Sequence, residues 1–391
     1  MPILSRSRPD SSDRAAQKGR RRFGRVGALF AAGILAVWAG SAARAEIVIG
    51  VAVPLSGQFE AFGKDILLGV NLAVQRANAE NWAGEPVRVV AEDDKCTEEG
   101  GRDAANRLIG ARVSAVIGHM CWRASVAGSG LYHENGIVQI SPATRYAKLT
   151  DERPDPNGGV YRLIGRADRQ APALTTFIAE RFARSRIAFV HDNSPYGKGL
   201  ASSVQAGLAE QGIRDVLFNE FEPGQDAYSG LVSRINDALA EVVVIGGFFG
   251  DAAVIVRTMR ARGMTQPMIG GDTLGAAEFW TIAGDAGGGT LFSAPVDPRT
   301  LPDAAALVSD ITGRDQAPQP YSLYGYGALQ ILTAALSDAG SNQFEALVQA
   351  MNDTPFETIL GTVRFDDNGD SDVPSFTIYE WAGGNTFRFG E

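Results

Sequence analysis

Two short motifs in the chain are similar to nucleotide-binding loops, and both lack residues that this chemistry needs. In Gly57–Asp65 (GQFEAFGKD), five residues instead of four separate the glycines, and Lys64 is followed by Asp65 where a phosphate loop has Ser or Thr. Tyr196–Ser202 (YGKGLAS) keeps only the first two glycines of a GxGxxG dinucleotide motif. The simpler interpretation of both segments is a turn at the start of a helix.

Motifs for metal binding and for nucleophilic catalysis are also missing. The sequence contains no HExxH, GxSxG or DxDxDG pattern. Its three histidines, His119, His133 and His191, lie too far apart to predict a zinc cluster. We therefore expect no metal, no cofactor and no enzymatic activity. An extracellular enzyme on the same scaffold stays open as an alternative, which turnover of a ligand by the purified protein would reveal.

The residues with useful chemistry lie in loops that follow predicted strands. They combine aromatic rings, hydroxyl groups and one charge of each sign: Phe62, Trp122, Thr144, Arg145, Tyr196, Phe248, Phe249 and Asp272. Arg145 could grip a carboxylate in a fork geometry, and Asp272 could accept a hydrogen bond from an ammonium or hydroxyl group. Such a set favours binding of a small zwitterion or organic acid. The alternative is that the rings belong to the core and the two charges are solvated or paired.

These loops connect alternating strand and helix patterns. From Ile47 on, β-branched runs such as Ile47–Leu55 alternate with amphipathic segments such as Gly63–Glu80. Repeated βαβ units predict mostly parallel sheets, whose ligands bind beyond the carboxyl ends of the strands. The polar segment Asp151–Gly159 interrupts the series, which then resumes. We expect two doubly wound α/β lobes joined by a hinge of several chain crossings, with the ligand between the lobes.

The predicted organisation divides the chain into five parts. They are a signal peptide (1–45), lobe one (46–163), lobe two (164–295), a return to lobe one (296–364), and a hinge crossing with the C-terminal strand of lobe two (365–391).

The first of these parts has the pattern of an export signal. Gly19–Arg25 (GRRRFGR) is strongly basic, Val26–Ala43 contains 18 uncharged residues, and Ala43-Arg44-Ala45 is a small-x-small cleavage site. We expect cleavage near Ala45-Glu46 and a mature protein in the periplasm. A retained transmembrane helix is the alternative. The Arg20-Arg21 pair leaves both the general and the twin-arginine export routes open.

The charge distribution argues against a nucleic-acid partner. The formal net charge is −9, and residues 1–45 contribute +7 from nine Lys/Arg and two Asp, so the rest of the chain carries −16. An acidic body repels a phosphate backbone. The mature part also contains both cysteines, Cys96 and Cys121, and an oxidising compartment would allow a disulfide between them. Two reduced, buried thiols are the alternative.

Across the mature chain the sequence resembles the periplasmic leucine/isoleucine/valine-binding proteins, the substrate-binding subunits of branched-chain amino-acid-type ABC importers. Eight segments carry the resemblance in order: Ile49–Asn78, Glu92–Cys96, Val116–Cys121, Gly136–Thr144, Ile187–Ala201, Val243–Phe249, Ile269–Asp272 and Phe365–Asp370. The resemblance implies a type I periplasmic binding fold that closes on its ligand, a disulfide between Cys96 and Cys121, and an ABC permease in the inner membrane as partner. We also expect a monomer.

The resemblance carries over only part of the family's pocket. Tyr196 is kept, and Phe62 supplies the aromatic residue of the first loop. Ala143 matches a position whose main chain meets the ligand's amino group. Asp272 replaces the Glu that pairs with the ammonium, and Phe248 replaces a Tyr.

Two departures change the part of the pocket that holds the carboxylate. Trp122 stands where the family has a small hydroxyl residue after the second cysteine, and Arg145 replaces a nearby Thr. An Arg that faces an apolar ligand without an anion carries a desolvation cost. We therefore expect a small carboxylate-bearing ligand, an amino acid or a related organic acid or amide. The expected contacts are Phe62, Trp122, Ala143, Thr144 and Arg145 from lobe one and Tyr196, Phe248 and Asp272 from lobe two. The alternative function is a periplasmic sensing module that signals without transport.

Overall fold

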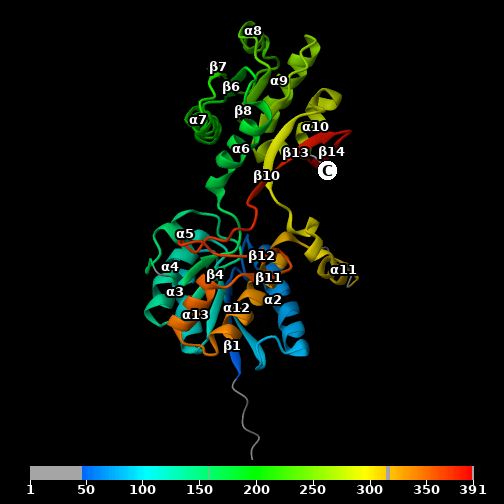
Figure 1. The fold of residues 1–391 in the computed structure, drawn as a ribbon. Helices are drawn as coiled ribbons and strands as arrows, with labels where there is room; N and C mark the ends of the chain where they lie inside the picture. Colours follow the sequence, from blue (N-terminus) through cyan, green and yellow to red (C-terminus); the bar gives the residue numbers. More distant parts are fainter. Residues whose placement is uncertain (1–45, 157, 314–317, 390–391) are drawn as a thin grey trace, which may run out of the picture. The chain divides into compact units, whose positions relative to one another are not determined.

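The computed structural model describes residues 46–156, 158–313 and 318–389 (Figure 1). Its two large β-sheets are each packed against helices. The predicted export signal, residues 1–45, lies outside the described residues. No described helix is both long enough and apolar enough to cross a bilayer.

The first sheet contains five parallel strands in the order β2-β1-β3-β4-β5. The strands are β1 (Ile47–Val53), β2 (Val87–Asp93), β3 (Ala115–Gly118), β4 (Val138–Ser141) and β5 (Val160–Arg162). The helices and the small antiparallel hairpin that belong with this sheet are α2 (Glu60–Glu80), α3 (Glu98–Gly110), α4 (Trp122–Glu134), α5 (Lys148–Asp151), α11 (Ala305–Gly313), α12 (Pro320–Ala339), α13 (Phe344–Asp353), β11 (Phe356–Thr358) and β12 (Gly361–Val363).

The apolar run of β1 follows from burial on both faces of this sheet. Ile49 and Val51 point to the cluster that includes the buried residues of α2 and α12, whereas Val48 and Ala52 belong to the cluster under α3 and α4. Successive side chains of a strand alternate between the two faces, so a doubly covered strand is apolar at nearly every position. Because β1, β3 and β4 are parallel, the loops that follow them lie at the same, carboxyl edge of the sheet.

The second sheet contains seven strands in the order β14-β13-β10-β9-β8-β6-β7. Its strands are β6 (Ile187–His191), β7 (Asp215–Glu220), β8 (Val242–Gly246), β9 (Met268–Gly270), β10 (Leu291–Pro295), β13 (Phe376–Ala382) and β14 (Asn385–Arg388). Its helices are α6 (Gln170–Phe182), α7 (Pro195–Glu210), α8 (Ser229–Asp237), α9 (Phe249–Ala261) and α10 (Ala277–Ala283). Buried residues of α6 and α7 cover one face, and those of α8, α9 and α10 cover the other.

The chain passes between the two sheets three times, as the order of the strands requires. We call residues 163–169, after β5, the first crossing, residues 296–304, after β10, the second, and residues 364–375, before β13, the third. The predicted fold of two doubly wound α/β lobes joined by several crossings is confirmed. The sequence analysis did not identify β10, β11, β14, α5 or α10. β13 and β14 pair antiparallel to their neighbours.

Gly69 of α2 allows the close approach of α2 and α12. A Cβ atom at this position would lie 1.7 Å from the main-chain oxygen of Ser322. We therefore expect Gly69→Ala to push the two helices apart and to lower the free energy of unfolding by about 1–3 kcal/mol. Urea unfolding followed by circular dichroism measures the loss. Gly110→Ala is the matched control, because its Cβ would meet no atom within 4 Å; equal stability of the two variants would contradict the prediction.

Candidate ligand-binding site

The three residues predicted from lobe two lie together at the carboxyl edge of the second sheet. Tyr196 is in the first turn of α7, Phe248 precedes α9, and Asp272 follows β9. The Tyr196 hydroxyl donates to Asp272 Oδ1 at 2.9 Å, and the rings of Tyr196 and Phe248 lie 5.8 Å apart between centroids. Phe248 is 47% exposed. Phe249, which was also singled out in the sequence, packs against the core instead.

Gln170 joins this group and was missed in the sequence analysis. It is the first residue of α6, only 7% exposed, and its Nε2 donates to Asp272 Oδ1 at 2.9 Å. Burial raises the pKa of Tyr196, and the neighbouring carboxylate of Asp272 raises it further, so the hydroxyl stays protonated as a donor. Both described donors meet one oxygen of Asp272. The second oxygen, Oδ2, is the one we assign to a ligand below.

The aromatic residues predicted from lobe one form two ring contacts. Phe62, 42% exposed, packs edge-on against Tyr321, with ring centroids 5.6 Å apart. Trp122, also 42% exposed, contacts the ring of Tyr146 at 4.7 Å, and the guanidinium of Arg123 lies 4.7 Å over the Trp122 ring. Among the described residues, four of the seven exposed large hydrophobic side chains are aromatic residues that follow strands, in loops or in first helical turns, counting Phe248 of lobe two. The core alternative is thereby excluded for Phe62, Trp122 and Phe248.

Arg145 lies in the loop after β4, and one of its nitrogens lacks a partner. Its Nη1 is buried and makes no hydrogen bond within the part of the chain that the structure describes. The charge of Arg145 acts on the buried Tyr324. Burial raises the pKa of Tyr324 to about 12, and the positive charge of Arg145 opposes that shift. Arg145 is absent from the described ion pairs. A buried cationic nitrogen without an acceptor is costly, so this position favours an anion from outside the chain.

Tyr321 and Tyr324 were also missed; they lie in the first two turns of α12. Arg145 and Tyr321 both influence the pKa of Tyr324, Arg145 lowering it and Tyr321 raising it. Tyr321 in turn contacts Phe62. The only sequence signal was a pair of aromatic residues spaced three apart at the start of a predicted helix, which equally fits a core face.

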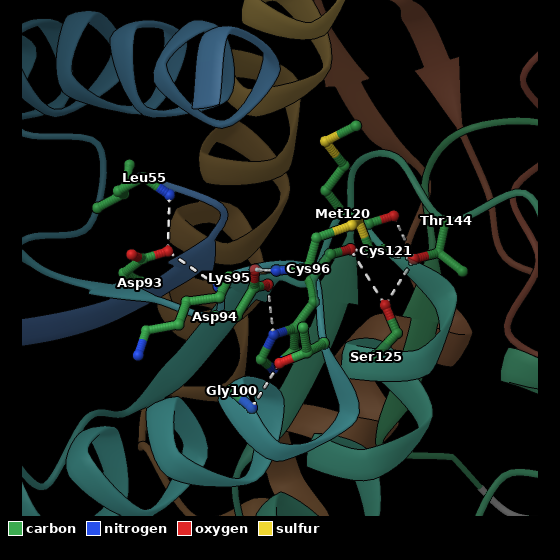
Figure 2. The surroundings of a disulfide bond; sticks show 12 residues. Leu55, Asp93, Asp94, Lys95, Cys96, Gly100, Met120, Cys121, Ser125 and Thr144 are labelled. Atoms are coloured by element: carbon green, nitrogen blue, oxygen red, sulfur yellow. Dashed lines mark hydrogen bonds and ion pairs between the residues drawn. A yellow bond between two sulfur atoms is a disulfide. The ribbon is translucent and has the colours of Figure 1, made fainter. Parts of the chain in front are cut away.

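Ala143 and Thr144 are buried and shape the loop from inside. The Thr144 side chain is 1% exposed, and its hydroxyl bonds to Ser125 Oγ at 2.5 Å and donates to the carbonyls of His119 and Met120 (Figure 2). This hydroxyl therefore holds two loops of lobe one together. Ala143 is 7% exposed, and its N–H lies 3.4 Å from Ser141 Oγ.

The disulfide implied by the resemblance is present between Cys96 and Cys121 (Figure 2). Cys96 follows β2, and its N–H donates to Asp94 Oδ1 at 2.8 Å. Cys121 is the residue before α4 and directly precedes Trp122. The bond therefore ties the loop after β2 to the loop that presents Trp122, and the alternative of two free thiols is wrong.

Loss of this disulfide should destabilise the protein. The two cysteines are 25 residues apart, and in the chain-entropy model closing such a loop stabilises by about 3 kcal/mol. We expect the Cys96→Ala, Cys121→Ala double variant to lose about that much free energy of unfolding in urea. A reducing agent should destabilise the wild type equally and leave the double variant unchanged. Loss of less than about 1 kcal/mol would contradict this prediction.

His119 and His191 make hydrogen bonds within the fold. His119 is fully buried, with Nδ1 2.8 Å from Asp94 Oδ2 and Nε2 3.1 Å from the Tyr132 hydroxyl. His191 accepts from the N–H of Asn193 at 3.1 Å. Among the residues that the structure describes, no group of His, Cys, Asp and Glu is arranged to hold a metal ion.

Comparison with known proteins identifies the family of this chain. A family model described as periplasmic binding protein matches residues 46–385. Leu/Ile/Val-binding protein homolog 2 of Brucella abortus (strain 2308) is 34% identical over 352 residues, which cover 90% of this chain and 94% of the relative. An ABC transporter substrate-binding protein from Desulfitobacterium hafniense, at 25% identity, matches with a TM-score of 0.66 over 88% of this chain and 100% of its own. Another D. hafniense structure of that description, a complex with Leu, matches with a TM-score of 0.64 at 24% identity over the same shares. This chain belongs to the periplasmic binding protein family.

Proposed function

We propose that this chain is an extracytoplasmic solute-binding protein of an ABC import system, which captures a small carboxylate-bearing molecule and releases it unchanged. Members of its family are substrate-binding proteins of transporters rather than enzymes. The B. abortus relative is named for binding Leu, Ile and Val. Residues 46–163 and 296–364 would form lobe one, and residues 164–295 and 365–391 would form lobe two and its crossing, as expected from the sequence.

The observation that carries the carboxylate assignment is the unpaired Nη1 of Arg145. This atom is buried, and the charge of Arg145 acts on Tyr324, whose own hydroxyl is held protonated by burial. A planar guanidinium with free donors matches the two oxygens of a carboxylate. An aliphatic group at the same place would leave the cation buried without a partner, which is strongly unfavourable.

The other groups suggest the rest of the ligand. The exposed rings of Phe62, Trp122 and Phe248 would pack against its body. Asp272, through Oδ2, would accept from an ammonium, amide or hydroxyl donor. The ligand is therefore an amino acid or a related organic acid or amide. Contacts from both lobes, made only when the ligand lies between them, would favour the closed state.

A thermal-shift screen tests this function. The compounds are L-leucine, L-phenylalanine, phenylacetate and its neutral analogue phenylacetamide, within a wider set of amino acids, organic acids and amides. A compound present at 100 times its dissociation constant stabilises the native state by about 2.7 kcal/mol. We expect carboxylates to raise the melting temperature and to be recovered unaltered after incubation. Failure of every carboxylate, or conversion of one to a product, would overturn the proposal.

A transport assay separates import from sensing. If the chain serves import, deletion of its gene should abolish cellular uptake of the carboxylate found in the screen. Unchanged uptake together with an altered transcriptional response would support the sensing alternative.

A further inference from the structure

The buried guanidinium of Arg162 packs against the loop that carries Arg145. Arg162, the last residue of β5, has no exposed surface although it is one of the largest side chains in the protein. Its Nε donates to Asp370 Oδ1 at 2.7 Å, and Asp370 is only 5% exposed. Burial lowers the pKa of Arg162 from its usual value, while the charge of Asp370 opposes that shift. An Arg stays protonated in such surroundings, so the two form a buried ion pair.

The remaining donors of Arg162 hold the main chain of the loop. Nη1 donates to the carbonyl oxygen of Tyr146 at 2.6 Å and, at 3.4 Å, to that of Thr144, and Nη2 donates to that of Ala147 at 3.1 Å. The remaining carbonyl, that of Arg145, accepts from the N–H of Ala167 at 3.0 Å. Every carbonyl from residue 144 to residue 147 is therefore bound by a donor from β5 or the first crossing. These bonds fix the backbone from which the side chains at 145 and 146 project.

The same cluster reaches the third crossing. Thr150 Oγ1 accepts from Arg162 Nη2 and donates to Asp370 Oδ1 at 2.9 Å. Asp370 lies on the third crossing, whose main chain forms a parallel bridge with β5 at Arg162. The second carboxylate oxygen of Asp370, Oδ2, accepts a hydrogen bond from Nη1 of Arg166, on the first crossing, at 2.8 Å. Two crossings and the loop thus share one carboxylate.

We propose that Arg162 is a positioning residue for ligand binding. Its buried guanidinium sets the place of Arg145 and Tyr146 and, through Asp370, joins their loop to the first and third crossings. This inference rests on the proposed function, in which this loop lines the ligand site. The loop that carries Arg145 is hydrogen-bonded to the first crossing and, through Arg162 and Asp370, to the third, and both crossings connect the lobes. Binding of an anion to Arg145 therefore links the position of this loop to closure of the lobes.

A ligand-free measurement tests the positioning itself. The protein is labelled with 5-fluorotryptophan, and the fluorine resonance of Trp122, assigned by its loss in Trp122→Phe, reports on Tyr146 because the two rings are in contact. Arg162→Lys keeps the charge but loses the fork that holds three carbonyls. Thr150→Val removes the hydroxyl at nearly constant volume, and Thr150→Ser keeps it. We expect Arg162→Lys and Thr150→Val to shift or broaden the Trp122 resonance and Thr150→Ser to restore it.

A destabilised control separates positioning from general weakening of the lobe. Val70→Ala opens a cavity at a fully buried position of α2, an element other than the loop. This variant should lower the melting temperature and leave the Trp122 resonance in place. The Trp82, Trp280 and Trp381 resonances should stay unchanged in every variant except for local effects of Val70→Ala. An unchanged Trp122 resonance in both Arg162→Lys and Thr150→Val would overturn the proposal, as would an equal change in Val70→Ala.

Calorimetric titration measures the consequence for binding. With phenylacetate, L-phenylalanine or L-leucine, whichever the wild type binds most tightly, Arg162→Lys and Thr150→Val should weaken affinity at least tenfold, and Thr150→Ser should stay within twofold. Wild-type affinity in Arg162→Lys would overturn the role in binding. If the wild type binds none of the three probes, the proposed function loses its support, while the fluorine measurement still decides whether Arg162 positions the loop.

Discussion

Arg145→Met is expected to abolish tight binding of the carboxylate ligand. The substitution keeps the length and much of the apolar stem of the side chain but removes the donors. A carboxylate enclosed without its partner costs about 2–5 kcal/mol, so the dissociation constant should rise roughly 30- to 5,000-fold. The measurement is isothermal titration with the carboxylate that gives the largest thermal shift. The variant should fold normally, because Arg145 makes no described side-chain hydrogen bond or ion pair that the protein would lose.

The neutral amide of that carboxylate is the control. The wild type should bind the amide more weakly than the acid, because the amide carries no charge to pair with the guanidinium. Arg145→Met should change affinity for the amide by less than about fivefold. Equal loss for acid and amide would mean that the substitution disturbs the site generally. Unchanged affinity for the acid would remove Arg145 from the site.

The sequence predicted the scaffold of this site well, because the strands can be recognised from the composition of short segments. Continuous apolar runs such as Ile47–Val53 and Val242–Gly246 are buried on both faces, so their composition alone indicates strands of a parallel sheet. The ends of such strands are then known, and with them the segments that hold the site residues. Phe62, Trp122 and Tyr196 were expected in loops, but the helices begin earlier than predicted and these three lie in first helical turns. The other three are Arg145, Phe248 and Asp272. β10 (LFSAP) and β14 (NTFR) contain no continuous apolar run, since Ser293 and Pro295 interrupt the first and polar residues open and close the second.

What the sequence could not predict depends on contacts between distant segments. Gln170 reaches Asp272 across 102 residues, and Tyr324 reaches Arg145 from a helix that returns to lobe one late in the chain. Thr144 was expected in the site as a hydroxyl group of a loop that follows a strand, but its hydroxyl is turned to Ser125 and to two carbonyls. Which of two adjacent side chains points outward depends on the hydrogen bonds of the loop, and these come from elsewhere in the fold.

Arg162 shows this dependence most strongly, and its loss should have the largest effect on stability. We expect Arg162→Met to lower the free energy of unfolding by about 3–5 kcal/mol, the range for breaking a buried ion pair by removing one partner. The carboxylate of Asp370 would retain Arg166 and Thr150 but lose its buried partner, and three loop carbonyls would lose a donor. Urea unfolding followed by circular dichroism measures the change.

Arg88→Met is the matched control, since it is the same substitution at an exposed ion pair of the same lobe. Arg88 and Glu46 are each 46% exposed, so solvent screens their attraction and the pair should contribute less than about 1 kcal/mol. Similar losses for both variants would mean that burial of Arg162 adds nothing. A loss below about 1 kcal/mol for Arg162→Met would show that the apolar replacement compensates for the missing bonds. The expected large difference follows from geometry, because Arg88 is exposed whereas Arg162 is completely buried and has acceptors from a loop, a helix and a crossing.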